Sequence, residues 1–244
     1  IQRTSPNSFS TQPPAAESSC ILYFCDMVID SVIAKKLANF LLQIKAIELR
    51  PKNPFIWASG LKSPIYCDNR IILSNPKVRN FVQENLSFQI KEKFPDVQVI
   101  AGVATGAIGI AALVAHQLDL PMIYVRPSAK GHGRQNLIEG RLKNGQKVVI
   151  VEDLISTGMS SLKAFQSVIE SKGEVLGMSA IFTYGFDIAK VAFLKKECDL
   201  ITISDYSHLI SSLKDSKSFN SHEISALESW RENPKTWNGL NLKA

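Results

Sequence analysis

The chain has 244 residues, of which 45% are hydrophobic and 20% are charged. This composition is typical of a globular protein with a substantial core, and it excludes a chain that is disordered throughout. Lysine and arginine total 28 against 22 acidic residues, an excess that suits an anionic small molecule as well as nucleic acid, and no apolar run reaches the roughly 18 residues of a membrane span.

The first 26 residues differ in composition from the rest of the chain. Residues 1–19 are rich in Ser, Pro, Thr and Gln, and Asp26 interrupts the short apolar patch that follows them. Such a segment cannot bury enough apolar surface to order itself, and it lacks a signal-peptide cleavage site. We expect the functional chain to begin at Met27 and residues 1–26 to be a disordered or non-native extension. A targeting or docking tail is the alternative.

Two amphipathic helices are predicted before residue 96. Apolar residues recur at steps of three and four from Ile29 to Leu49, and again from about Pro76 to Phe94. Between these helices, Gly60 and Pro64 break residues 55–70 into short extended pieces.

After residue 95 the chain alternates strands with helices. Strands are predicted at 97–100, 121–125, 147–151, 175–183 and 200–204, and helices at 110–118, 158–171 and 187–197. This alternation predicts an α/β fold with a parallel sheet covered by helices on both faces. We therefore assign residues 27–95 to an N-terminal part, 96–210 to an α/β core, and 211–244 to a tail with a helix near 222–231.

The most informative stretch begins with the strand at Lys147. Apolar residues run directly into Glu152 and Asp153, and hydroxyl residues with Gly158 then open a helix. Free backbone N–H groups at a helix N-terminus bind anions, and a glycine lets the backbone approach a phosphate closely. Carboxylates beside a phosphate suit a ligand that also carries hydroxyls, a bound Mg²⁺ or a cationic transition state. An ordinary N-cap with solvated acids is the alternative at this point.

Residues 148–161 resemble the 5-phosphoribosyl 1-diphosphate (PRPP) motif of type I phosphoribosyltransferases, in which apolar residues precede two acids and a Thr/Ser-Gly turn. The resemblance implies that the loop holds the 5-phosphate and that the acids hold the ribose hydroxyls. It implies the type I phosphoribosyltransferase fold, a central parallel sheet flanked by helices with a small N-terminal hood. The implied PRPP-binding residues in this stretch are Glu152, Asp153, Leu154, Ile155, Ser156, Thr157, Gly158, Met159 and Ser160.

A basic, glycine-rich stretch at residues 124–140 is similar to the mobile loop of the orotate-specific members of that family. Cations on a hinged loop can neutralise a departing diphosphate and exclude water. The resemblance carries over Arg126, Lys130 and His132 as PRPP ligands, and it makes Lys130, His132 and Asp153 the catalytic residues. Pro127 stands where many members have a second cation.

Residues 57–70 are similar to the segment of those members that forms the hood over the base. The resemblance implies orotate contacts by Lys62 and Tyr66, and by Ser156 of the PRPP motif. Residues 101–109 correspond to the diphosphate-binding turn of the family, where contact would come from backbone N–H groups.

The resemblance implies transfer of the phosphoribosyl group of PRPP to orotate, which gives orotidine 5′-monophosphate and diphosphate in UMP biosynthesis. It implies Mg²⁺ held by PRPP and water without direct protein ligands, and a homodimer with active sites shared across the interface. Four cysteines without a CxxC pair favour reduced thiols in the cytoplasm. We expect no nucleic-acid partner, because the sequence shows no helix-turn-helix or strongly basic helix, and no membrane partner. A phosphoribosyltransferase for another base and a non-catalytic PRPP-binding regulator are the alternatives.

Overall fold

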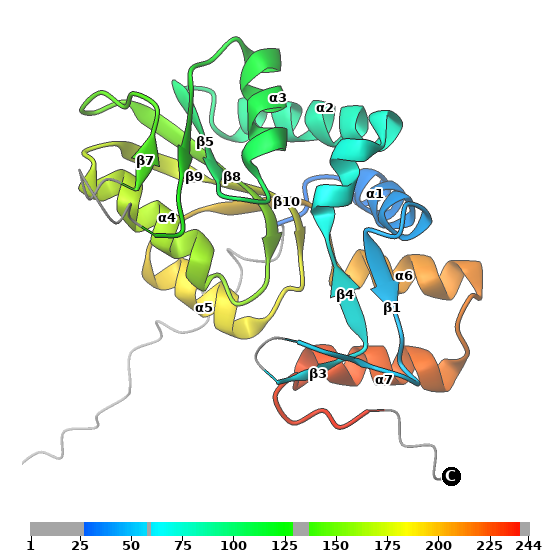
Figure 1. Ribbon diagram of the computed structural model, residues 1–244. Helices are drawn as coiled ribbons and strands as arrows, with labels where there is room; N and C mark the ends of the chain where they lie inside the picture. Colours follow the sequence, from blue (N-terminus) through cyan, green and yellow to red (C-terminus); the bar gives the residue numbers. More distant parts are fainter. Residues whose placement is uncertain (1–26, 58–59, 129–136, 240–244) are drawn as a thin grey trace, which may run out of the picture.

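A six-stranded sheet forms the centre of the molecule (Figure 1). The computed structural model describes residues 27–57, 60–128 and 137–239. The predicted residues Lys130 and His132 lie outside this part of the chain.

The first strand of the α/β core, β5 (Val99–Val103), lies in the interior of the sheet. The order is β10-β9-β8-β5-β6-β7, with β7 antiparallel at one edge and the other neighbours parallel. The strands are β5 (Val99–Val103), β6 (Met122–Val125), β7 (Ile138–Glu139), β8 (Lys147–Ile155), β9 (Glu174–Thr183) and β10 (Leu200–Asp205). The chain winds from β5 outward to β6 and then returns to β8 on the other side. The carboxyl ends of β5 and β8 therefore flank the point where the winding reverses, which is where open α/β sheets bind ligands.

Helices cover both faces of this sheet, as the alternation of strands and helices predicts. One buried cluster joins α1 (Ser31–Gln43), α2 (Pro76–Lys93) and α3 (Ile108–Leu118) to side chains such as Val149 and Val151 of β8. The other joins α4 (Met159–Glu170) and α5 (Asp187–Lys195) to the alternating neighbours Val148 and Ile150. Successive side chains of a strand point to opposite faces, so both faces of β8 are apolar and the strand is buried.

The first helix is shorter than the sequence pattern predicts. Asp30 caps α1 by accepting hydrogen bonds from the N–H groups of Val32 and Ile33 at 2.8 and 3.0 Å. The helix ends at Gln43, and Lys45 adopts a positive φ of 58°. Residues Ile47–Leu49, predicted as helix, instead form β1. Apolar residues at alternate positions fit a half-buried strand as well as a helix end, and pairing with another strand decides between them.

Short strands build the hood beside the sheet. β1 pairs antiparallel with β4 (Ile65–Cys67), and β2 (Phe55–Ile56) pairs with β3 (Lys62–Ser63). The 3₁₀ helix η2 (Asn69–Ser74) then leads into α2. The hood therefore precedes the core in sequence, and η2 connects the hood to α2.

The C-terminal tail packs against the hood. It contains α6 (Tyr206–Ser216), which crosses the expected boundary at residue 210, and α7 (Ser221–Glu232). A cluster of aromatic rings joins this tail to the hood and to the end of β9, and we call it the aromatic cluster: Trp57, Tyr184, Phe186, Tyr206 and Trp230. The ring centroids of Trp230 lie 5.8 Å from Trp57 and 5.5 Å from Tyr184. The tail therefore packs against the hood through the contact between Trp230 and Trp57.

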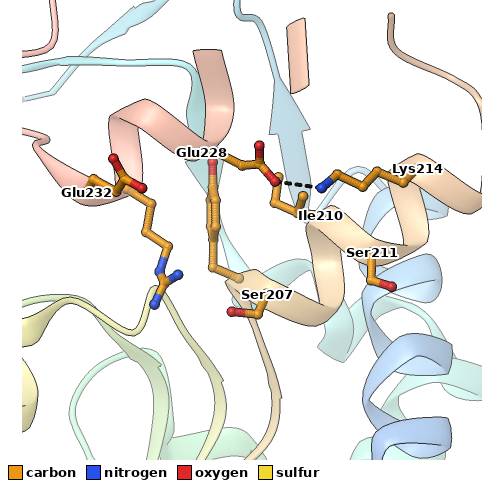
Figure 2. Close-up of a pocket in the computed structure, with 8 residues that line it drawn as sticks. Ser207, Ile210, Ser211, Lys214, Glu228 and Glu232 are labelled. Carbon is orange, nitrogen blue, oxygen red and sulfur yellow. Dashed lines mark hydrogen bonds and ion pairs between the residues drawn. The ribbon is translucent and has the colours of Figure 1, made fainter. Parts of the chain in front are cut away.

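A polar cavity of about 370 Å³ lies between α6 and α7 (Figure 2). Lys214 Nζ donates to Glu228 at 2.7 Å across it. None of the predicted site residues lines this cavity. Among the described residues, the helices are too short or too polar to cross a bilayer.

Candidate functional site

Two turns meet where the winding of the sheet reverses. The first turn, residues 104–107, follows β5 and contains a cis peptide bond between Ala104 and Thr105. A Cβ added to Gly106 would clash with the carboxylate of Asp153 at the end of β8. The turn after β5 therefore lies directly against Asp153, and its backbone can approach that carboxylate so closely only because Gly106 has no side chain.

The second turn, residues 156–158, opens helix α4. Gly158 is its N-cap with a φ of 78°, and no side chain caps the helix. A Cβ on Gly158 would lie 2.8 Å from the ring of Phe193. The first N–H groups of α4 have no partner within the helix, and the helix dipole adds positive potential there. With Ser156 and Thr157 half-buried beside it, this turn has the donors that a phosphate group requires.

The two acids of β8 have different surroundings. Glu152 is 4% exposed, and its carboxyl accepts hydrogen bonds from the Ser161 hydroxyl at 2.9 Å and from the Asp153 N–H at 3.0 Å. Burial, and then the nearby charge of Asp153, raise the pKa of Glu152 well above its usual value. The Asp153 side chain is partly exposed and lies against the Gly106 turn. Glu152 is therefore held by α4, whereas the carboxylate of Asp153 lies against the turn after β5.

The hood reaches the end of β8 through a residue that the sequence analysis did not select. Asn69 is 3% exposed, and its Nδ2 donates to the backbone oxygen of Asp153 at 2.6 Å. The predicted base contacts Lys62 and Tyr66 are exposed on β3 and β4, and no hydrogen bond among the described residues joins either side chain to β8. Tyr66 packs against Phe55 with ring centroids 5.6 Å apart.

The basic loop is fastened to the core on both sides of its undescribed part. The Arg126 N–H donates to the Leu137 oxygen at 2.8 Å, and the Arg126 guanidinium lies 3.5 Å from the Glu139 carboxylate. Lys163 of α4 donates to the Pro127 oxygen at 2.8 Å. Arg126 therefore stands at the carboxyl end of β6, next to β5 in the sheet.

Two residues that shape the site have no individual role in the sequence analysis. Asn69 lies within the hood segment 57–70, and Ser161 ends the motif 148–161. The partner of each lies far away along the chain or on another element. A local pattern carries no signal for such a contact, so these residues can be found only in the folded chain.

The site lies within a region that matches known proteins. A family model of the phosphoribosyl transferase domain matches residues 70–211. The chain is 50% identical to the orotate phosphoribosyltransferase of Listeria innocua, over 84% of this chain and 98% of that protein. It is 51% identical to the orotate phosphoribosyltransferase of Phocaeicola vulgatus, over 84% and 97% respectively. The crystal structure of orotate phosphoribosyltransferase from Aeropyrum pernix matches with a TM-score of 0.65 and 25% identity, over 75% of this chain and 99% of that one.

Proposed function

The chain belongs to the orotate phosphoribosyltransferases, within the family of the phosphoribosyl transferase domain, and from this premise we propose how its own residues carry out the reaction. The protein transfers the phosphoribosyl group of PRPP to orotate, and it releases diphosphate with orotidine 5′-monophosphate in pyrimidine biosynthesis. The observation that carries the proposal is the contact between the Gly106 turn and Asp153, beside the free N-terminus of α4.

The 5-phosphate of PRPP binds in the turn that opens α4. The backbone of Leu154–Ser160 and the hydroxyls of Ser156, Thr157 and Ser160 supply its donors. This assignment is supported by the positive φ of Gly158 and by the uncapped N-terminus of the helix. Both features direct N–H groups at the ligand.

The acids Glu152 and Asp153 hold the ribose hydroxyls. Asp153 is supported in this role by its partly exposed position against the Gly106 turn. Glu152 is supported by its hydrogen bond from Ser161, which orients the buried carboxyl at the end of β8. As diphosphate departs, the ribose gains positive charge, and the carboxylate of Asp153 beside it stabilises that cation more than it stabilises the ground state. Glu152, whose pKa burial raises, holds a ribose hydroxyl by a hydrogen bond.

The departing diphosphate is met by cations and backbone donors. Arg126 at the end of β6 and the backbone N–H groups of Thr105 and Gly106 approach it from the described part of the chain, whereas the Ala107 N–H donates to the Val103 oxygen at 3.1 Å. Lys130 and His132, outside that part, complete the set, with Lys130, His132 and Asp153 as the catalytic residues. Among the described residues no group of three or more acidic, histidine or cysteine side chains gathers to hold a metal. Mg²⁺ would be held by PRPP oxygens and water, and there it would neutralise diphosphate charge.

Orotate binds between the hood and the PRPP turn. Lys62 and Tyr66 contact it from the hood and Ser156 contacts it from the turn, so that its ring nitrogen meets the ribose carbon. Positioning accounts for much of the catalysis, because the attack needs no covalent enzyme intermediate. The assignment is supported by the position of the hood, which Asn69 and the aromatic cluster join to the carboxyl ends of β8 and β9.

We also propose that the enzyme is a cytoplasmic homodimer in which the loop carrying Lys130 completes the active site of the partner subunit. The free thiols of Cys67 and Cys198 support a reducing compartment. A shared site would make the dimer the active unit.

A spectrophotometric assay that follows orotate loss with PRPP and Mg²⁺ tests the function. Uracil, hypoxanthine and adenine are run in parallel and followed by diphosphate release. We expect turnover with orotate alone. Turnover with another base would overturn the assignment of the hood, and PRPP binding without turnover would indicate a regulator.

A further inference from the structure

Asn69 occupies the junction between the hood and β8. Its side-chain amide is buried, and its Nδ2 donates to the backbone oxygen of Asp153 at 2.6 Å, although 84 positions separate the two residues in sequence. A buried amide is costly unless its polar atoms are hydrogen-bonded. The bond therefore contributes to where the backbone of Asp153 lies.

The neighbouring thiol supports this orientation of the amide. Cys67 Sγ lies 3.4 Å from Asn69 Oδ1. Burial, followed by the charges of Asp153 and Asp68, raises the pKa of Cys67, so the thiol keeps its proton and can donate to Oδ1. A flipped amide would place its oxygen against the carbonyl oxygen of Asp153. Donors and acceptors match at both ends of the side chain only in the observed orientation.

The charged neighbours of Asn69 pair with each other. Asp68 accepts hydrogen bonds from Arg70 Nε at 2.6 Å and from its second guanidinium nitrogen at 2.8 Å. Because Asp68 and Arg70 bind each other, the amide of Asn69 is the group that connects η2 to β8. On the other side of Asp153, the Gly106 turn contacts the carboxylate. The residue is thus held through its carbonyl by Asn69, while its side chain faces the turn.

We propose that Asn69 is a positioning residue for Asp153: it holds the backbone carbonyl and so sets the direction in which the carboxylate meets the ribose of PRPP. The inference rests on the proposed role of Asp153 in binding ribose. Asn69 itself need not touch substrate. Because the bond starts in the hood, it also joins the segment over the base to the strand that presents the acids.

The test compares Asn69→Ala and Asn69→Asp with Asn85→Ala. Asn85 is a matched control, since its Nδ2 also donates to a backbone carbonyl, that of Phe81, at 2.7 Å on α2. The measurements are the Kd of PRPP by calorimetry without orotate, the KM of orotate, and urea unfolding. We expect both Asn69 variants to bind PRPP about tenfold more weakly or worse, as for other residues that orient a ligand-binding group. The orotate KM should rise by a smaller factor than the Kd of PRPP, and Asn85→Ala should bind PRPP as the wild type does.

Asn69→Asp keeps the size of the side chain, so it tests the inference even if Asn69→Ala fails to fold. Unchanged PRPP affinity in a folded Asn69 variant would overturn the inference, and so would a raised orotate KM with PRPP affinity retained, because that result indicates a role confined to the hood. Asp153→Asn is measured alongside. If it binds PRPP normally, the proposed role of Asp153 itself is wrong; if it alone binds weakly, only the role of Asn69 is wrong.

Discussion

Glu152 and Asp153 are adjacent in sequence but differ in burial and in partners. The carboxyl of Glu152 is buried against Ser161 of α4, whereas the carboxylate of Asp153 faces the Gly106 turn. Burying a carboxyl group disfavours its ionised form. The two acids therefore combine a buried, oriented group with an accessible one at the same end of β8.

Replacing Glu152 should change how stability depends on pH. Its folded-state pKa lies well above the ordinary value of 4.5, so the stability that its proton confers is complete below that value and is lost as pH rises toward the folded pKa. Glu152→Gln stays neutral and escapes this loss. We expect its free energy of unfolding to exceed that of the wild type by more at about pH 8 than at about pH 5, measured by urea unfolding of the free enzyme.

Glu223 provides a control of opposite sign. The Asn220 N–H and Lys52 hold the pKa of Glu223 below its usual value, so its ionised form stabilises the fold above the unfolded pKa. Glu223→Gln should therefore lose stability at both pH values. An advantage of Glu152→Gln that does not depend on pH would show that Glu152 is ionised in the folded protein.

Lys130 should act mainly on the chemical step. A cation that meets the departing diphosphate tightens its contact as charge develops, so Lys130→Ala should lower kcat by about 10²-fold. Lys143 is exposed and lies between β7 and β8. It serves as a control, and Lys143→Ala should leave kcat unchanged. Steady-state kinetics decides, and a raised KM with wild-type kcat would remove Lys130 from catalysis.

At the scale of the element, the turn that opens α4 depends on a left-handed residue packed against another helix. Gly158 has a positive φ and lies against Phe193 of α5. A side chain there would be strained and would also push α4 away from α5. The same turn binds the 5-phosphate in the proposed function, so fold and binding depend on the same glycine.

Gly158→Ala should lose about 1–3 kcal/mol of stability and bind PRPP more weakly. Gly145 is a matched control, because its φ of 75° is similar and a Cβ there meets no atom within 4 Å. Gly145→Ala should lose less stability and keep its PRPP affinity. Urea unfolding and calorimetry measure the two effects, and equal losses in the two variants would contradict a role for the contact with Phe193.

Helix α7 should affect base binding through the aromatic cluster. Trp230 is almost fully buried and contacts Trp57 of the hood. Trp230→Ala should lower the free energy of unfolding by about 3–5 kcal/mol and raise the KM of orotate more than the Kd of PRPP. Trp237 is buried in the same tail, and Trp237→Ala should raise the orotate KM less. The same KM in both variants would argue against support of the hood by Trp230.

At the scale of the whole molecule, the proposed active site combines parts that are distant in sequence. The hood, the turns after β5 and β8, and the end of β6 meet at one edge of the sheet because parallel strands bring their carboxyl ends together. Arg126 stands at the end of β6, where the loop toward Lys130 begins. In the proposed homodimer, Lys130 serves the site of the partner subunit.

Mixing Lys130→Ala with Asp153→Asn tests a shared site. If Lys130 acts across the interface, each mixed dimer contains one intact site and one doubly altered site. Equal mixing after subunit exchange should then restore about a quarter of wild-type activity. Each variant alone, taken through the same exchange, is the control. No recovery in a mixture that has exchanged would show that each site is complete within one chain.

Local patterns were sufficient to predict the alternating core, and they place the proposed PRPP site at Glu152–Ser160. Apolar periodicity reports burial directly, and a Thr/Ser-Gly turn between a buried strand and a helix is a local phosphate signal. The same patterns misassigned Ile47–Leu49, because a short apolar segment fits a helix or a strand equally well. Pairing with β4 decides between them.

The sequence by itself determined the class of fold and the resemblance to orotate-specific enzymes, and it predicts the PRPP turn, since each depends on contiguous residues. Only the tertiary structure decided that the acids of β8 have different surroundings, that Asn69 holds the carbonyl of Asp153, and that α7 supports the hood. These features depend on contacts between segments far apart in the chain. Such contacts form only when burial of the shared core brings those segments together.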